Sequence, residues 1–225
     1  MALKLSVIII TMVRKIHFSN REGIVYSKKN RTKTSIIFSL ISLVMFLGGI
    51  YLMSLTFAPV FKPGIVLGKP VDVTKEKPRI GQDMLYIPKI SVAVPVLAGG
   101  AEVMEEGAWH RFPERGDPVT GGNFIVSAHR FVMKWTPGAT MNSSPFYNVG
   151  KLNEGDEILV DYKGKRYKYQ IGKKYSVKPD AINIEDPVKN RIPDHKLTLY
   201  SCTLEGSGDG RDVFEAKLIG EVKVE

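Results

Sequence analysis

One stretch of the sequence, residues 36–58, is predominantly apolar and carries no charged side chain. As a helix rising about 1.5 Å per residue, it extends about 34 Å, which exceeds the roughly 30 Å hydrocarbon core of a bilayer. A core helix of a globular protein rarely stays apolar on every face over such a length, because one face normally meets solvent. The stretch therefore predicts one membrane-spanning helix.

The positive charge of the chain is concentrated before this stretch. Residues 1–35 hold eight basic side chains and one acidic one, whereas the remaining residues hold 24 basic and 22 acidic ones. A nucleic-acid-binding domain keeps its basic excess on the folded part, so this distribution argues against a nucleic-acid partner. The basic cluster directly before the apolar stretch predicts a cytoplasmic N-terminus, an extracellular remainder and a single-pass protein of the cell membrane.

A cleaved signal peptide is the competing interpretation. Its apolar region usually has about 7–15 residues, which is shorter than the one here, and Thr56-Phe57-Ala58 is a poor cleavage site. The sequence therefore favours an uncleaved anchor. The resulting division is a basic cytoplasmic tail (1–35), a transmembrane anchor (36–58), a proline-containing extracellular stalk (59–82) and a folded domain (83–225).

The folded domain is predicted to be mainly β. Short runs rich in β-branched and aromatic residues recur along it, and two of them flank Lys163-Gly164-Lys165 as a hairpin would. Seven or eight such strands with two short helical segments, Ala101–Ala108 and Pro179–Ile184, favour a closed barrel or a sandwich. The expected strands are Met84–Ile87, Lys89–Leu97, Asn123–Ala128, Glu157–Tyr162, Arg166–Ile171, Lys173–Lys178, Leu197–Cys202 and Asp212–Ile219.

Cys202 is the one cysteine of the chain, which excludes a disulfide framework and a cysteine-rich zinc site. It ends a β-run and precedes the glycine-rich stretch 206–210, a place where a reactive side chain can meet a substrate. Most cysteines outside the cell are paired, so an unpaired one suggests that its reactivity is used. A small buried hydrophobe remains the alternative interpretation.

A reactive thiol needs a neighbour that favours the thiolate. Among the four histidines, His129 ends an apolar run as Cys202 does, whereas His17 lies in the predicted cytoplasmic tail. Arg211 opens a later β-run, and its guanidinium has five donors suited to an oxyanion. A structural role for His129 and a solvated surface position for Arg211 remain the plainer alternatives.

The segments Ser127-Ala128-His129-Arg130 and Thr198-Leu199-Tyr200-Ser201-Cys202, followed by Arg211, resemble the motifs of the sortases. These are cysteine transpeptidases that attach surface proteins to the bacterial cell envelope. The similarity extends over most of residues 84–222, and the stretch from Arg211 to Leu218 resembles the last strand of the class D and E branches.

The resemblance implies an eight-stranded β-barrel with the three residues at one end of a groove. It implies that Cys202 is the nucleophile, His129 the general acid and base, and Arg211 the stabiliser of substrate and oxyanion. Ala128, Thr198 and Ser201 are expected at the substrate groove. The usual residues at 128 and 201 are Gly and Thr, and these two departures affect the expected substrate preference more than the expected activity.

The implied reaction cleaves a C-terminal sorting motif of a secreted protein through a thioester and transfers the acyl group to an amine of the cell envelope. Two alternatives remain open, a hydrolytic cysteine protease of the same fold and a non-catalytic, membrane-anchored β-domain that binds a surface partner. Glu102, Glu105 and Glu106 are neighbours, but their spacing specifies no calcium site. We therefore expect no metal and no cofactor.

Overall fold

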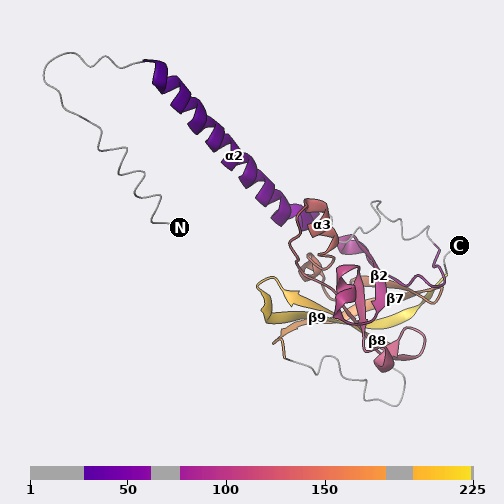
Figure 1. The fold of residues 1–225 in the computed structure, drawn as a ribbon. Coiled ribbons are helices and arrows are strands. Elements are labelled where there is room, and N and C mark those ends of the chain that lie inside the picture. Colours follow the sequence, from indigo (N-terminus) through magenta and orange to yellow (C-terminus); the bar gives the residue numbers. More distant parts are fainter. Residues whose placement is uncertain (1–27, 62–76, 181–194, 224–225) are drawn as a thin grey trace, which may run out of the picture. The chain divides into compact units, whose positions relative to one another are not determined.

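The computed structural model describes residues 28–61, 77–180 and 195–223 (Figure 1). The chain divides into two compact units, Met1–Gly48 and Gly49–Glu225, and each is described by itself. Most of the predicted tail, much of the predicted stalk and part of the predicted helix at Pro179–Ile184 lie outside the described residues.

The predicted apolar span is helical. Helix α2 covers Lys28–Phe61, and within it Thr34–Val60 is long and apolar enough to cross a membrane. The helix begins before the predicted span, and it continues beyond it through the first residues of the predicted stalk. Its large apolar side chains, such as Phe38, Met45 and Phe46, are exposed. A helix with apolar side chains exposed on all faces matches a lipid environment better than water.

The domain after residue 83 is a closed β-barrel. Hydrogen-bonded neighbours follow the order β3-β2-β1-β6-β7-β9-β8-β5, and β3 also pairs with β5, which closes the ring with eight strands. This pairing excludes the sandwich and confirms the barrel. A two-residue strand, β4 (Gly116–Asp117), is added at the edge of β5. The eight strands are β1 (Met84–Ile87), β2 (Val92–Ala98), β3 (Ala108–Arg111), β5 (Gly121–Ser127), β6 (Glu157–Tyr162), β7 (Lys165–Val177), β8 (His195–Thr203) and β9 (Gly206–Val222).

Short helices occupy the connections between strands. Helix α3 covers Pro137–Asn142, and its N-cap Thr136 accepts a hydrogen bond from the Ala139 amide at 3.2 Å. The described residues also form four short 3-10 helices: η1 (Pro88–Ile90), η2 (Ala101–Glu105), η3 (Pro113–Arg115) and η4 (Val149–Lys151).

Several sequence predictions differ from the structure. The helix predicted at Ala101–Ala108 is the short η2, and the chain then enters β3, because Ala108 and His110 alternate inward. The strands predicted at Arg166–Ile171 and Lys173–Lys178 are one strand, β7, which remains paired across a register shift between Ile171 and Lys173. The strand predicted from Lys89 begins only at Val92, after η1.

The predicted hairpin is confirmed. Tyr162 pairs with Lys165, and the two residues between them, Lys163 and Gly164, have φ angles of 50° and 80°. Positive φ at both central residues is the conformation that matches the twist of two-residue hairpins, and Gly164 adopts it without a Cβ penalty.

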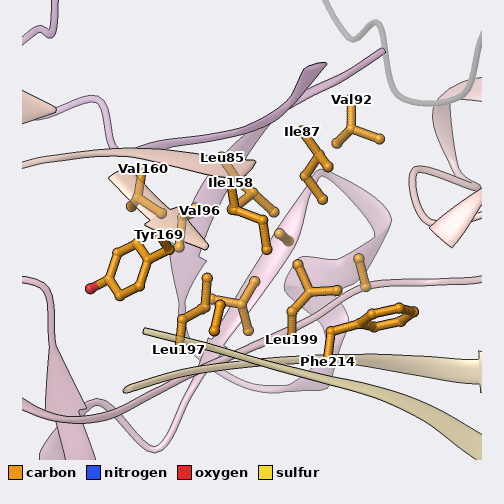
Figure 2. Close-up of a cluster of buried hydrophobic side chains, with 14 of the residues drawn as sticks. Leu85, Ile87, Val92, Val96, Ile158, Val160, Tyr169, Leu197, Leu199 and Phe214 are labelled. Carbon is orange, nitrogen blue, oxygen red and sulfur yellow. The ribbon is translucent and has the colours of Figure 1, made fainter. Parts of the chain in front are cut away.

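One hydrophobic cluster fills the barrel (Figure 2). Leu197 and Leu199 of β8 pack there with Phe214 of β9 and Leu85 of β1, and all four side chains are fully buried. Since side chains alternate along a strand, burial of every second residue of β8 and β9 sends the residues between them to the outer face. This alternation determines where the chemistry-bearing residues lie.

Candidate functional site

Cys202 and Arg211 are direct partners in the antiparallel ladder of β8 and β9. Leu199 and Phe214, a partner pair in the same ladder, both point into the core, and Cys202 and Arg211 stand three residues from them. They therefore project from the outer face of the barrel. Residues directly opposite in such a pair have Cβ atoms about 5 Å apart, so the guanidinium and the thiol share one patch of surface. Cys202 is half-buried and unpaired.

His129 reaches the same patch from β5. This strand runs parallel to β8, with Ser127 opposite Tyr200. Continued by two residues, the register brings His129 beside Cys202. The hydrogen bond that Ser201 Oγ donates to the Ala128 carbonyl at 3.0 Å supports this continuation. The Phe146 amide donates to the His129 carbonyl at 3.1 Å and holds the backbone at that point.

The residues expected at the substrate groove lie beneath this surface. Ala128, Thr198 and Ser201 are exposed by 2%, 0% and 1%. Thr198 Oγ1 donates to Asn123 Oδ1 at 2.6 Å, so it joins β8 to β5 as Ser201 does further along. As folded here, the three residues support the floor of the site and offer little surface to a ligand.

A carboxylate contacts the imidazole of His129. Glu105 Oε1 lies 3.5 Å from His129 Nε2, and Glu105 Oε2 accepts a hydrogen bond from Lys134 Nζ at 2.6 Å. That hydrogen bond lowers the pKa of the Glu105 carboxyl below its ordinary value. Lys134 is held in turn, because its amide donates to Thr140 Oγ1 of α3 at 2.9 Å. The segment after His129 thus contributes an ordered charge to the site.

The guanidinium of Arg211 is fixed by its own loop. Arg211 Nη1 donates to the Ser207 and Gly210 carbonyls, both at 2.8 Å. The glycine-rich stretch 206–210 belongs to β9, and the ladder shifts register after Cys202 so that Thr203 pairs with Gly206. The extra residues bulge between these pairs and supply the carbonyls.

A small apolar cluster adjoins Cys202 on the outer face. Ile125, Tyr200 and Val213 form it, and Tyr175 and Val177 of β7 pack against it. Tyr200 Oη accepts a hydrogen bond from Arg111 Nη1 at 2.8 Å. An apolar floor beside a thiol and a fixed cation is suited to hold an extended peptide by its side chains.

The other histidines lie elsewhere or outside the described residues. His110 is 4% exposed, stacks edge-on against Phe124 at 4.7 Å and contacts the Gly116 carbonyl at 3.1 Å. Burial lowers the pKa of His110, which favours its neutral form. His195 begins β8 and therefore stands at the opposite end of that strand from Cys202. In the described ranges, no three His, Cys, Asp or Glu residues group as metal ligands would.

Sequence analysis did not single out a buried ion pair next to the site. Arg130 Nη1 donates to Asp212 Oδ2 at 3.0 Å, and Arg130 is 6% exposed. These residues directly follow His129 and Arg211 in the chain. The one signal in the sequence is that opposite charges follow two candidate residues, and the pairing itself spans 82 positions.

Comparisons with known proteins agree with the resemblance in the sequence. A model of the sortase domain family matches residues 85–219. The sortases SrtE1 and SrtE2 of Streptomyces coelicolor are each 27% identical to this chain over 157 and 154 residues, which cover 64% and 59% of this chain. These alignments cover 42% and 56% of the relatives, so the chain spans about half the length of the curated relatives it matches.

A solved structure is similar as well. The sortase D5 transpeptidase of Clostridium perfringens matches with a TM-score of 0.51 and 27% identity, over 66% of this chain and 84% of that one. The names of these relatives include the class D and class E sortases, the branches that the segment from Arg211 onward resembles.

Proposed function

We propose that this chain, which belongs to the sortase family, acts as a membrane-anchored cysteine transpeptidase. The observation that carries the proposal is the pairing of Cys202 with Arg211 on β8 and β9, at the level that the chain reaches at His129, two residues after β5 ends. A thiol, an imidazole and a guanidinium at one end of three adjacent strands form a set able to perform acyl transfer. The half-buried position of Cys202 is compatible with contact with a substrate.

The reaction would proceed in two displacements. The Cys202 thiolate attacks the carbonyl carbon of a peptide bond, and the carbonyl oxygen becomes an oxyanion. As the C–N bond breaks, the His129 imidazolium gives its proton to the leaving amine, and an acyl thioester remains on sulfur. A second amine then attacks the thioester and loses a proton to His129. The new amide leaves and the thiolate is restored.

Arg211 would stabilise the oxyanion. Its two described hydrogen bonds both use Nη1, which orients the guanidinium and leaves the other donors of the fork to a ligand. A donor fixed before the reaction loses little freedom when charge develops, and one such donor is typically worth about 3–4 kcal/mol of barrier. An ammonium group lacks this planar fork.

The substrates would be secreted proteins that bear a C-terminal sorting motif, and the acceptor an amine of the cell envelope. Helix α2 would hold the enzyme in the membrane through residues 36–58, with the N-terminus in the cytoplasm and the barrel outside. Tethering raises the effective concentration of two membrane-bound partners without any new contact.

Product masses test the proposal against hydrolysis by the same fold. The full chain in detergent would be incubated with peptides carrying candidate sorting motifs, with and without a peptide amine. A transpeptidase forms a peptide joined to the added amine, and this product dominates over the free acid. Free acid alone at every amine concentration would indicate a protease instead. A Cys202→Ala variant that forms either product would remove Cys202 from the reaction.

A further inference from the structure

We propose that Arg130 and Asp212 are a positioning pair, which sets His129 and Arg211 on either side of Cys202. The inference rests on the function proposed above. Arg130 follows His129 in the segment directly after β5, and Asp212 follows Arg211 in β9. A single ion pair between these neighbours therefore fixes the two chain segments that carry the imidazole and the guanidinium.

The pair joins three strand regions. Arg130 Nη1 lies 3.0 Å from Asp212 Oδ2, and Asp212 Oδ1 accepts a hydrogen bond from Ser176 Oγ of β7 at 2.7 Å. Asp212 is also the ladder partner of Ser201, which binds the Ala128 carbonyl. The carboxylate thus connects β7 and β9 to the segment that follows β5.

The guanidinium of Arg130 lies in a fitted space. A Cβ atom on Gly150 would stand 2.8 Å from Arg130 Nη2, so a side chain at this position would require the guanidinium to shift. Phe146, four residues earlier, donates its amide to the His129 carbonyl at 3.1 Å. The segment 146–150 therefore confines both His129 and Arg130.

Both members of this ion pair are largely buried, so each depends on the other for compensation of its charge. The side chains of Arg130 and Asp212 are 6% and 20% exposed, and burial lowers the pKa of the Arg130 guanidinium although Asp212 opposes the change. Within the described part of the chain, Arg130 Nε has no hydrogen-bond partner, and Asp212 favours the charged guanidinium more strongly than the second carboxylate that acts on it, Glu205. Water cannot readily replace the carboxylate at such a site. We therefore expect loss of the ion pair to displace the backbone of the segments that carry His129 and Arg211.

A second buried ion pair provides a matched control. Arg166 Nε and Nη2 donate to Asp161 Oδ1 and Oδ2 at 2.6 and 2.8 Å, and both side chains are at most 3% exposed. Arg166 pairs with Val222 in the β7/β9 ladder, whereas Arg211 pairs with Val177 at the other end. On β9, Val222 lies eleven positions after Arg211, a rise of about 35 Å along the strand.

The experiment compares Asp212→Asn with Asp161→Asn in the full-length chain, at a temperature at which both remain folded by near-UV circular dichroism. The thioester-forming kcat and KM are measured, together with the pH dependence of alkylation of Cys202 by iodoacetamide. We expect both variants to lose thermal stability. Asp212→Asn alone should lose about 100-fold in kcat with KM within about threefold, since a displacement of about 1 Å is enough for such a loss. Its alkylation midpoint should also move to higher pH.

The double variant Arg130→Met/Asp212→Leu removes the ion pair and leaves no unpaired buried charge. It therefore distinguishes the loss of positioning from the cost of burying an unpaired charge. It should recover stability and keep the loss of kcat. Recovery of both, or a wild-type kcat in folded Asp212→Asn, would overturn the inference. If the wild-type chain forms no thioester, the proposed function fails, and the alkylation profile still decides about the pair: equal midpoints in wild type and Asp212→Asn refute it.

Discussion

Cys202 and Arg211 are nine residues apart in the chain and directly opposite each other on the β8/β9 ladder. A tight turn alone would pair residues at a fixed register, but here the ladder shifts after Cys202, and the residues between form a bulge. The carbonyls of this bulge bind Arg211 Nη1. One irregularity of the strand thus sets both the position and the orientation of the cation beside the thiol.

Arg211→Lys should reduce the kcat of thioester formation by about 100- to 1000-fold, because an ammonium group cannot bind the bulge and an oxyanion with one planar fork. Arg79→Lys, a change at an exposed residue remote in sequence from the site, is the control and should match wild type. Intact-protein mass spectrometry after rapid quenching measures the acyl-enzyme. A rate within threefold of wild type in Arg211→Lys would exclude the proposed role of Arg211.

Gly150→Ala should reproduce the loss of kcat expected for Asp212→Asn. The added Cβ would stand 2.8 Å from Arg130 Nη2, and Gly150 has no positive φ that would strain the backbone itself. Gly138→Ala in α3 is the control, since nothing lies within 4 Å of its Cβ position. Steady-state kinetics on both variants test the prediction, and equal activities would show that Arg130 adapts without consequence.

The single cysteine makes the membrane topology measurable. If the barrel is extracellular, a membrane-impermeant maleimide added to intact cells should label Cys202. In a Cys202→Ala background, Ser19→Cys in the basic tail should be labelled only after permeabilisation. Labelling is measured by gel shift. The opposite pattern, with the tail labelled on intact cells, would reverse the proposed orientation.

Asp117→Asn should lower the free energy of unfolding by roughly 1 kcal/mol at pH 7. Burial raises the pKa of Asp117, but hydrogen bonds from the Thr120 and Val119 amides, each at 2.7 Å, outweigh it, and the pKa falls below its ordinary value of 3.8. A lowered folded-state pKa gives stability that is present above pH 4 and is lost as the pH falls through that pKa.

The stability difference between wild type and Asp117→Asn should therefore shrink between about pH 5 and pH 3. Urea titrations at several pH values measure it. Asp180→Asn, at an exposed position, is the control. A difference that stays constant over this range would show that the charge of Asp117 does not contribute.

Alternation made several strands predictable. The bounds of β1 and β6 match their predicted bounds. In β6, Ile158 and Val160 alternate with less buried neighbours, whereas β1 is a short run of four buried residues that ends before Pro88. The sequence does not predict strand β3, since its four residues gain their partners only from β2 and β5, which are separated from it in the chain. The sequence predicts two strands where β7 is one, because sequence alone does not show that β9 continues to pair across the register shift.

The candidate site also has a part that the sequence predicts and a part that it does not. Cys202, His129 and Arg211 each stand near a strand end, and both this position and the chemistry of their side chains are visible in the sequence. The ion pair of Arg130 with Asp212 and the contact of Glu105 with His129 depend on how the barrel closes. Such contacts join residues that are distant in the chain. They depend on the topology of the barrel, so local sequence patterns do not predict them.

Peptide mapping of a trapped acyl-enzyme tests the central claim most directly. The full-length chain would be mixed with a sorting-motif peptide, quenched in acid and digested. We predict that the acyl mass is found on the peptide containing Cys202, that hydroxylamine removes it, and that it is absent from Cys202→Ala and strongly reduced in His129→Ala. An acyl group on another residue, or an unchanged yield in His129→Ala, would contradict the assignment.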